Sequence, residues 1–403
     1  MFENQDLMHT TPAVPGTAKQ TQRIGGNMRI LHVITGLQAA GCEMMLFKLL
    51  SASHDHWDQA VVSLSDEGTL GPRIANLGVP VHALGLCKSV LDPFRLLSVV
   101  PVVSSFRPQL IVGWMDHGNL AASLASSSFI PQLPVFWNIQ QSLQGLATER
   151  WSTAALIRMG VRLSRKPAAI IYNSRISAKQ HEAFGYCDAR TTVIPTGFDC
   201  QQFRPDPEAR RQVRAELGLA EDAIVIGLIA RYHPMKDHAG FLKATGLVAR
   251  SHPKVRFLLA GMGVTEHEPA FQKLMADHQL EGRVLMLGER EDVPRITAAL
   301  DIACSASAWG EGFSNAVGEA MACAVPCVVT DVGDSAYLVS DTGLSIPPRS
   351  PEAFADALNK LVESGADCRR QLGQAARRRI EAEFSLPSIA RCYEDLYEAH
   401  LTR

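Results

Sequence analysis

The sequence predicts an α/β protein made of two doubly wound domains in series, each with a parallel β-sheet covered by helices. Its 403 residues exceed the roughly 100–200 residues of a typical single domain. Strand and helix patterns alternate along the chain, stop, and then begin again, which favours two α/β units. The strand patterns are nearly continuous runs of Val, Ile and Leu, as expected for strands buried on both faces of a parallel sheet.

The first domain is expected to span residues 28–198. It opens with the apolar run 29–35 (RILHVIT), which ends at Gly36 and is followed by a helical pattern. Helical patterns also lie between most of the later strand candidates, as an open α/β sheet requires. These further candidates are residues 60–64, 81–84, 110–114, 135–138, 169–173 and 192–194.

The second domain is expected over residues 199–385. Residues 196–207 (TGFDCQQFRPDP) contain Gly and Pro without any periodicity, so they are interpreted as part of a linker. A second strand series then begins at residues 224–230 (IVIGLIA), and helical patterns fill the chain from residue 351 onward. The other strand candidates of this domain are residues 255–260, 284–287, 302–304 and 327–330.

Composition and charge exclude several classes of protein. The net charge of −2 gives no basic excess, so no nucleic-acid partner is expected. The nine cysteines are scattered without the short spacings of zinc ligands, so no metal site is expected. No apolar stretch reaches the ~20 residues that span a bilayer. Residues 1–27 lack the apolar core of a signal peptide and are expected to form a disordered tail on a cytoplasmic protein.

A glycine-containing loop, GLQAAG, follows the first strand and ends at Gly41. Such a loop opening onto a helix exposes free N–H groups and the positive end of the helix dipole, which suit a phosphate group. The loop is not GxGxxG, and no acidic residue ends the second strand candidate, so a dinucleotide-dependent dehydrogenase is disfavoured. Without other evidence, a plain tight turn is an equal alternative.

Two cations, Arg231 and Lys236, follow the first strand of the second domain in the stretch ARYHPMKDH. Ligands of open α/β sheets bind at the carboxyl ends of strands, so these side chains are expected to face a ligand. A guanidinium and an ammonium can stabilise the charge on a departing diphosphate without a metal. The alternative is a pair of solvated surface charges.

The most specific motif is EGFSNAVGE, in which seven residues separate Glu311 from Glu319. Glu311 is expected on a loop after a strand, and Glu319 about one turn into a helix that Ser314 or Asn315 caps. One carboxylate could hold sugar hydroxyls and the other the two ribose hydroxyls, while the free N–H groups between them face phosphate and sugar. An amphipathic helix with exposed acids is the alternative. The residues of this motif expected to bind the donor are Glu311, Gly312, Phe313, Ser314, Asn315 and Glu319.

A basic amphipathic segment covers residues 150–166 and alternates apolar residues with Arg158, Arg162, Arg165 and Lys166. A helix of this kind can lie on an anionic membrane surface. A core-facing helix with solvated cations has the same pattern. The sequence leaves both interpretations open.

Taken in order, these motifs resemble retaining glycosyltransferases of family 4, which have the GT-B fold of two Rossmann-like domains facing across a cleft. The resemblance covers about residues 28–384. It implies that Arg231 and Lys236 bind the donor diphosphate, that Gly41 belongs to the phosphate loop, and that Arg290 in LGERED lies against the nucleotide base. It also implies that a helix at residues 386–400 crosses back onto the first domain. The stretches that carry the resemblance are GLQAAGCE, WNIQQSL, NSRISAKQHEAFGY, IPTGFD, ARYHPMKDH, LLAGMG and EGFSNAVGEAMACAVPCVVTDVGD.

The sequence departs from the family pattern at two places. Many members have a histidine near the sugar after the fifth strand, where this chain has Gln140 and Gln141. Glutamine can donate and accept hydrogen bonds but carries no charge. His117, after the strand at residues 110–114, is a candidate for that polar role, with a structural histidine as the equal alternative. The first glycine of the family's usual pair is replaced by Ala40, which should leave the backbone N–H groups available.

The resemblance implies a retaining, metal-independent transfer of a sugar from a nucleotide-diphosphate donor to a glycan or lipid-linked glycan in surface polysaccharide biosynthesis. The expected catalytic residues are Arg231, Lys236, Glu311 and His117, with Glu311 positioning the sugar and Glu319 the ribose. A nucleotide-sugar epimerase on the same fold and a non-catalytic nucleotide-sugar-binding partner are the alternatives.

Overall fold

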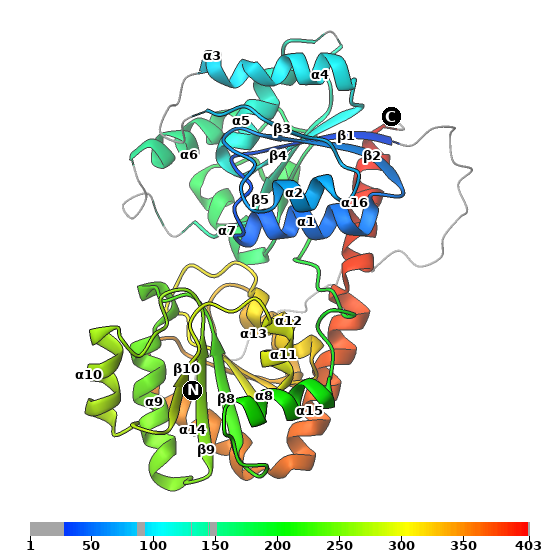
Figure 1. The fold of residues 1–403 in the computed structure, drawn as a ribbon. Helices are drawn as coiled ribbons and strands as arrows, with labels where there is room; N and C mark the ends of the chain where they lie inside the picture. Colours follow the sequence, from blue (N-terminus) through cyan, green and yellow to red (C-terminus); the bar gives the residue numbers. More distant parts are fainter. Residues whose placement is uncertain (1–27, 87–92, 130, 144, 146–150, 402–403) are drawn as a thin grey trace, which may run out of the picture.

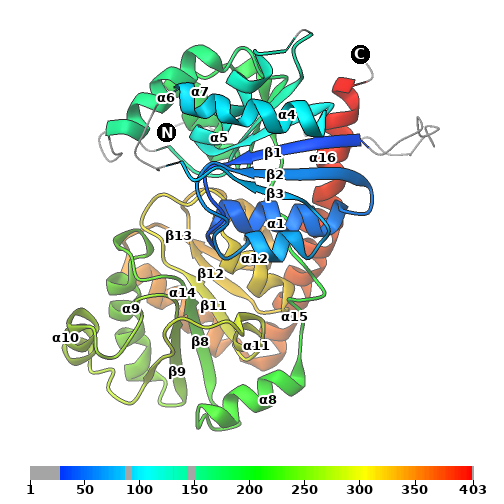
Figure 2. The same cartoon turned by 45° about the horizontal axis from the view of Figure 1, so that its top comes forward.

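The computed structural model describes residues 28–86, 93–129, 131–143, 145 and 151–401, so the predicted tail at residues 1–27 lies outside the described part of the chain. Figure 1 shows two α/β lobes, one above the other, with helical segments linking them along one side. Each lobe contains one parallel sheet with helices on both faces (Figure 2). The predicted fold class, two doubly wound α/β domains, is confirmed.

The first domain is built on a seven-stranded sheet of order β3-β2-β1-β4-β5-β6-β7 within the described residues. Its strands are β1 (Met28–Ile34), β2 (Trp57–Ser63), β3 (Val81–Ala83), β4 (Leu110–Trp114), β5 (Val135–Ile139), β6 (Ala169–Tyr172) and β7 (Thr191–Val193). Its helices are α1 (Gly41–Ser53), α2 (Gly71–Ala75), α3 (Pro93–Leu96), α4 (Val100–Phe106), α5 (Met115–Ser126), α6 (Trp151–Leu163) and α7 (Arg175–Phe184).

The second domain is built on a six-stranded sheet of order β10-β9-β8-β11-β12-β13. Its strands are β8 (Ile224–Ile229), β9 (Val255–Ala260), β10 (Val284–Met286), β11 (Ile302–Ser305), β12 (Cys327–Thr330) and β13 (Leu344–Ile346). The helices after β7 are α8 (Pro207–Glu216), α9 (His238–Ser251), α10 (Pro269–His278), α11 (Val293–Ala298), α12 (Asn315–Ala322), α13 (Ser335–Val339), α14 (Pro351–Glu363), α15 (Gly365–Arg379) and α16 (Leu386–Leu401).

The central strand β1 shows why the apolar runs are continuous. Successive side chains of a strand point to opposite faces of the sheet. Ile30 and Ile34 enter the apolar core on one face, whereas Leu31 and Val33 enter the core on the other. Because helices cover both faces, most positions of the strand interior are apolar. The polar exception, His32, is fully buried and hydrogen-bonds to Gln59 and Trp114.

The last helix, α16, returns to the first domain, where Figure 1 shows it beside the first sheet. Tyr393 and Tyr397 are fully buried in the core of that domain. The ring of Tyr397 lies 5.7 Å from that of Trp57, and Asn138 donates a hydrogen bond to the Tyr393 hydroxyl at 3.0 Å. The chain therefore crosses between the domains twice, and α16 is structurally part of the first.

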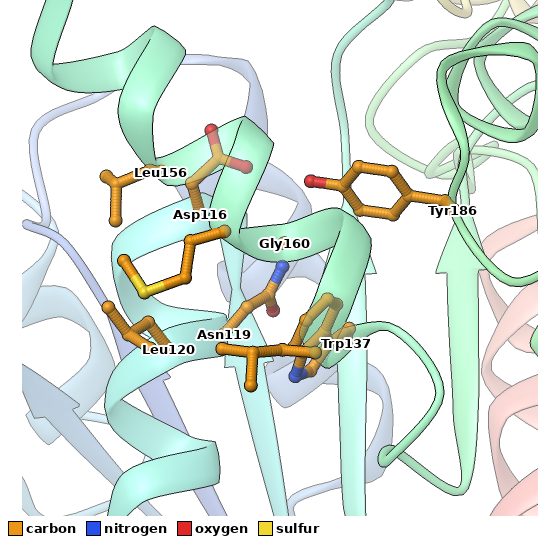
Figure 3. Close-up of a pocket in the computed structure, with 9 residues that line it drawn as sticks. Asp116, Asn119, Leu120, Trp137, Leu156, Gly160 and Tyr186 are labelled. Carbon is orange, nitrogen blue, oxygen red and sulfur yellow. The ribbon is translucent and has the colours of Figure 1, made fainter.

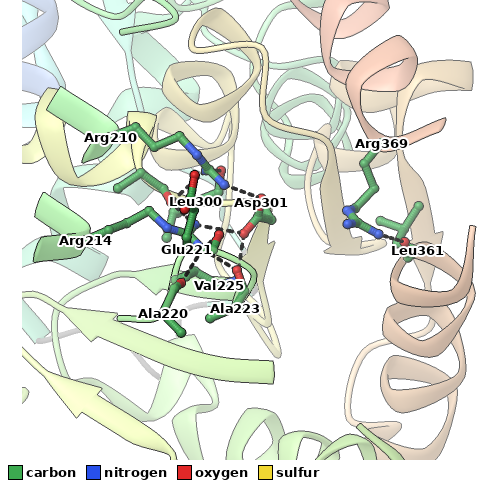
Figure 4. A network of polar contacts seen from close by, with 11 residues as sticks. Arg210, Arg214, Ala220, Glu221, Ala223, Val225, Leu300, Asp301, Leu361 and Arg369 are labelled. Atoms are coloured by element: carbon green, nitrogen blue, oxygen red, sulfur yellow. Dashed lines mark hydrogen bonds and ion pairs between the residues drawn. The ribbon is translucent and has the colours of Figure 1, made fainter. Parts of the chain in front are cut away.

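A polar network ties α8 to the amino ends of the second sheet (Figure 4). Asp301, just before β11, accepts hydrogen bonds from Arg210 at 2.7 Å, from Arg214 at 3.2 Å and from the N–H of Val225 at 2.8 Å. Nearby, Arg369 donates to the last carbonyls of α14. These arginines are satisfied by protein groups and lie at the sheet edge opposite the carboxyl ends, so we assign them a structural role.

Candidate active site

Two helix N-termini, one from each domain, lie close together. α1 begins at Gly41 after the loop that follows β1, and α12 begins at Asn315 after the loop that follows β11. A Cβ placed on Gly41 would lie 3.8 Å from Nδ2 of Asn315, so the two helix starts are close. Neither is capped by a side chain, because the N-cap residues Ala40 and Ser314 make no such bond. The free N–H groups and the two dipoles create a site suited to an anion.

Lys236 and Glu311, which belong to separate sequence motifs, are in contact. Lys236 donates a hydrogen bond from Nζ to Oε1 of Glu311, and Ser307 donates to the same oxygen at 2.8 Å. Lys236 stands on the short helical turn Pro234–Lys236, where the ring of His233 caps the first free N–H at 3.1 Å. The structure thus brings a cation and a buried carboxylate together where β8 and β11 end.

The two predicted donor-binding arginines differ in their surroundings. Arg231 follows β8, is exposed and forms no ion pair within the described residues, so its forked guanidinium is free to bind an anion. Arg290 follows β10 and is held by Asp292 through two hydrogen bonds of 2.8 and 2.9 Å. The donor groups of Arg290 are partly engaged, which leaves chiefly its planar face for a nucleotide base.

The second acid of the motif, Glu319, forms an ion pair with Lys48 of the first domain. Its Oε1 lies 3.5 Å from Nζ of Lys48 on α1, and the two side chains are only 18% and 10% exposed. Burial raises the pKa of the Glu319 carboxyl above its ordinary value, and the Lys48 ammonium opposes that rise. Sequence reasoning did not identify Lys48, because nothing in its local pattern distinguishes it from other helix lysines.

The loop between Glu311 and α12 packs closely on the first domain. A Cβ placed on Gly312 would lie 3.0 Å from Oδ1 and 3.2 Å from Nδ2 of Asn173, so a larger residue would push that side chain by a few tenths of an ångström. Asn173 follows β6 and is buried, with Oδ1 lacking a hydrogen-bond partner among the described residues. Phe313 is buried against Phe198, with ring centroids 6.1 Å apart, so its side chain belongs to the core and only its backbone can face a ligand.

A second contact that sequence reasoning missed joins Asp334 to the start of α7. The buried carboxylate of Asp334 accepts hydrogen bonds from the backbone N–H groups of Arg175 at 2.7 Å and Ile176 at 3.2 Å. Ser174 caps the next free N–H of the same helix at 3.0 Å. Burial raises the pKa of Asp334, while the α7 backbone bonds lower it. A carboxylate of one domain therefore caps a helix of the other, which stabilises the contact between the two domains.

The three polar candidates of the first domain lie after two adjacent strands. His117 is in the first turn of α5, and burial lowers its pKa, so its imidazole is neutral at pH 7. Gln140 donates a hydrogen bond to Asn138 at 2.5 Å, and Gln141 donates to Asp116 at 3.3 Å. Because β4 and β5 are neighbours, these side chains share one edge of the sheet.

The basic segment forms α6 and its C-terminal turn. Leu156 and Ile157 are buried in the core of the first domain, which matches the core-facing interpretation. The four cations on the outer face, Arg158, Arg162, Arg165 and Lys166, are exposed. Beneath α6 lies a small hollow lined by Asp116, Trp137 and Tyr186, among others (Figure 3). It is a tight packing space, because a Cβ on Gly160 would lie 2.2 Å from the Tyr186 hydroxyl.

The described part of the chain contains no group of three or more His, Cys, Asp or Glu side chains that could hold a metal ion. None of its helices combines the length and the apolar character needed to span a bilayer.

Two Rossmann-like domains, with cations and helix N-termini at their strand ends, have the arrangement of the GT-B fold. The model for glycosyl transferases group 1 matches residues 209–379, and that for a glycosyl transferase 4-like domain matches residues 25–197. A D-inositol 3-phosphate glycosyltransferase of Mycobacteroides abscessus is 33% identical over 406 residues, which cover 95% of this chain and 86% of that protein. The chain belongs to glycosyltransferase family 4.

Other relatives match in part or in fold. The putative glycosyltransferase EpsF of Bacillus subtilis is 28% identical over 217 residues, and the match covers 50% of this chain and about half, 54%, of EpsF. Anabaena Alr3699/HepE, solved in complex with UDP, superposes with a TM-score of 0.80 at 23% identity, over 92% of this chain and 100% of that one. WaaG, a glycosyltransferase of lipopolysaccharide biosynthesis, gives a TM-score of 0.71 at 15% identity over 91% and 99%.

Proposed function

We propose that this glycosyltransferase moves a sugar from a nucleotide-diphosphate donor to a hydroxyl group of a glycan or lipid-linked glycan, with retention of the anomeric configuration. The observation that carries the proposal is the pair of uncapped helix N-termini at Gly41 and Asn315, which lie close together. Arg231 and Lys236 follow β8, the strand that pairs with the β11 strand before Asn315. Backbone N–H groups from both domains and two cations would surround a diphosphate and stabilise the charge that grows as it leaves.

The reaction proposed here needs no protein nucleophile. The bond from the anomeric carbon to the diphosphate oxygen breaks, and the electron pair stays on that oxygen. The acceptor hydroxyl adds to the same face of the sugar, and its proton passes to the departing phosphate oxygen. Arg231, Lys236 and the backbone N–H groups of the two helix N-termini stabilise the leaving charge. Glu311, held by Lys236 and Ser307, would orient the hydroxyls of the transferred sugar.

The donor and acceptor would occupy opposite sides of the cleft. Glu319 would bind the ribose, and the planar face of Arg290 would lie against the base. We place the acceptor hydroxyl near His117, Gln140 and Gln141, which lie together at the edge of the first sheet. Because the imidazole of His117 is neutral at pH 7, it can accept or donate a hydrogen bond there.

A role in bacterial surface polysaccharide biosynthesis is supported by relatives such as the lipopolysaccharide core mannosyltransferase LpsB of Rhizobium meliloti, 29% identical over 247 residues. With a lipid-linked acceptor, a cytoplasmic enzyme would work at the inner face of the membrane. The exposed cations of α6, Arg158, Arg162, Arg165 and Lys166, would then contact anionic lipid headgroups. Sedimentation with anionic and neutral vesicles tests this contact.

The first experiment tests a panel of nucleotides and nucleotide sugars. Calorimetry measures their binding, and the release of free nucleotide measures their turnover. UDP and UDP-glucose come first, because HepE was solved with both. Binding with slow hydrolysis of one donor supports a transferase and identifies its sugar, and the anomeric configuration of the product, read by NMR, tests retention. Activity that persists in excess chelator is expected, and its full loss would contradict metal independence.

Two other outcomes would favour the alternatives. Conversion of a nucleotide sugar into its epimer without an acceptor would indicate an epimerase. Binding of a nucleotide sugar without hydrolysis or transfer would favour the non-catalytic nucleotide-sugar-binding partner. Failure of all nucleotides and nucleotide sugars to bind would mean that the chain retains the fold alone.

A further inference from the structure

Lys48 is a lysine in an unusual place, on the side of α1 that faces the second domain. It is 8% exposed, although lysines are almost never buried without a partner. Its ammonium group lies 3.5 Å from Oε1 of Glu319 and 5.6 Å from the centre of the Phe198 ring. Figure 2 shows α1 directly above α12, so the ion pair bridges the two domains.

Removal of such a buried pair from water is costly, so the pair is weak evidence for a purely stabilising role. The two carboxylate oxygens of Glu319 indicate what other role the pair has. Lys48 engages Oε1, while Oε2 has no hydrogen-bond partner in the described part of the chain and is not fully buried. One oxygen is therefore anchored to the first domain, and the other is free to accept a hydrogen bond from a ligand.

We propose that Lys48 is a positioning residue that keeps the Glu319 carboxylate oriented for the ribose hydroxyls of the donor. This inference rests on the proposed function, in which Glu319 binds ribose. Recognition of the nucleoside then requires both domains: α12 supplies the carboxylate and α1 supplies the cation that orients it. The diphosphate, held by helix N-termini and the Arg231 and Lys236 side chains, is recognised independently of Lys48.

The pH dependence of binding follows from the surroundings of Glu319. Burial raises the pKa of this carboxyl, and Lys48 is the charged group that lowers it. Cys323, the residue directly after α12, stays a neutral thiol because burial raises its pKa to about 12. Arg377 of α15, another cation near this end of α12, has its own partners: it donates to the carbonyl of Ala322 and pairs with Glu381. Without Lys48, the carboxyl would take up a proton at higher pH, and ribose would lose its charged acceptor.

The test measures binding of UDP, GDP and inorganic pyrophosphate by calorimetry, since pyrophosphate carries the diphosphate without the ribose. The variants are Lys48→Met, Lys48→Arg, Glu319→Gln and the double variant Lys48→Met/Glu319→Gln. Lys243→Met is the matched control, because Lys243 forms an exposed pair with Glu352 at 2.8 Å in the second domain.

We expect Lys48→Met to weaken binding of the preferred nucleotide about tenfold, and to leave pyrophosphate binding unchanged. The loss should shrink as the pH is raised, should be restored by Lys48→Arg, and should vanish in the Glu319→Gln background. Lys243→Met should bind like the wild type.

Two results would overturn the inference: unchanged or tighter nucleotide binding by Lys48→Met, or an equal loss for nucleotide and pyrophosphate. The second would mean that the pair only holds the domains together. Failure of the wild type to bind any nucleotide would instead contradict the proposed function, so the two failures are distinguishable.

Discussion

Replacement of Gly318 by alanine tests how tightly the acidic-motif helix is packed. A Cβ on Gly318 would lie 2.0 Å from Cζ of Phe198 and 2.3 and 2.4 Å from its two Cε atoms. Phe198 is fully buried and stacks on Phe313, so its ring has no open space to enter. Carbon atoms in contact sit about 3.5–4.0 Å apart, so either the ring or α12 must move by about 1.5 Å.

The expected cost is that of overpacking a core, about 1–3 kcal/mol. For a domain of this size, each kcal/mol lowers the melting temperature by about 2–4 °C, so a decrease of about 2–12 °C is expected. Because α12 carries Glu319 and begins at the anion site, its displacement should also weaken nucleotide binding. Thermal unfolding followed by circular dichroism and calorimetric titration with UDP and GDP measure the two effects.

A compensating variant separates this explanation from others. Phe198→Leu removes ring atoms that the new methyl group meets, so Gly318→Ala/Phe198→Leu should be more stable than the sum of the single changes predicts. The reasoning is refuted if Gly318→Ala melts within about 1 °C of the wild type, or if the two changes are simply additive.

Three further predictions address the site. Lys236→Ala should lower the rate of donor cleavage about 100–1,000-fold, and nucleotide release at saturating donor would count against this role if it fell less than about tenfold. Glu319→Ala should chiefly weaken donor binding, so unchanged affinity in calorimetry would contradict a ribose contact. Asp334→Asn removes a charged cap from α7 and should weaken the contact between the domains. We expect a larger radius of gyration in solution scattering, and an unchanged radius would show that the cap does not hold the domains together.

The fold was predictable because its signal is local. Buried parallel strands need apolar side chains on both faces, so continuous runs such as residues 224–230 mark them directly. The two halves of the site were also visible, since Lys236 and Glu311 each follow such a run. Lys236 and Glu311 follow neighbouring parallel strands, β8 and β11, so both lie at the carboxyl edge of the sheet, where ligands bind. Their contact with each other could therefore be expected.

The contacts between the domains were not predictable, because they depend on how two rigid bodies meet. Neither the Lys48–Glu319 pair nor the approach of Asn173 to Gly312 leaves a periodic or compositional trace in the sequence. Phe313 illustrates the same limit within one motif. The preceding residue, Gly312, approaches Asn173 of the first domain, whereas the side chain of Phe313 is part of the second domain's core.

The return of α16 to the first domain has a consequence for the order in which the protein matures on the ribosome. Tyr393 and Tyr397 are synthesised after the whole second sheet, yet they fill the core around Trp57 and Phe136. Domains usually complete their folding in the order of synthesis. Here the second domain can bury its apolar surface first. The first domain keeps part of its core exposed until α16 has been synthesised and has packed against it. A chaperone that shields nascent chains would therefore find its longest-lived binding surface on the part of the protein that was made earliest.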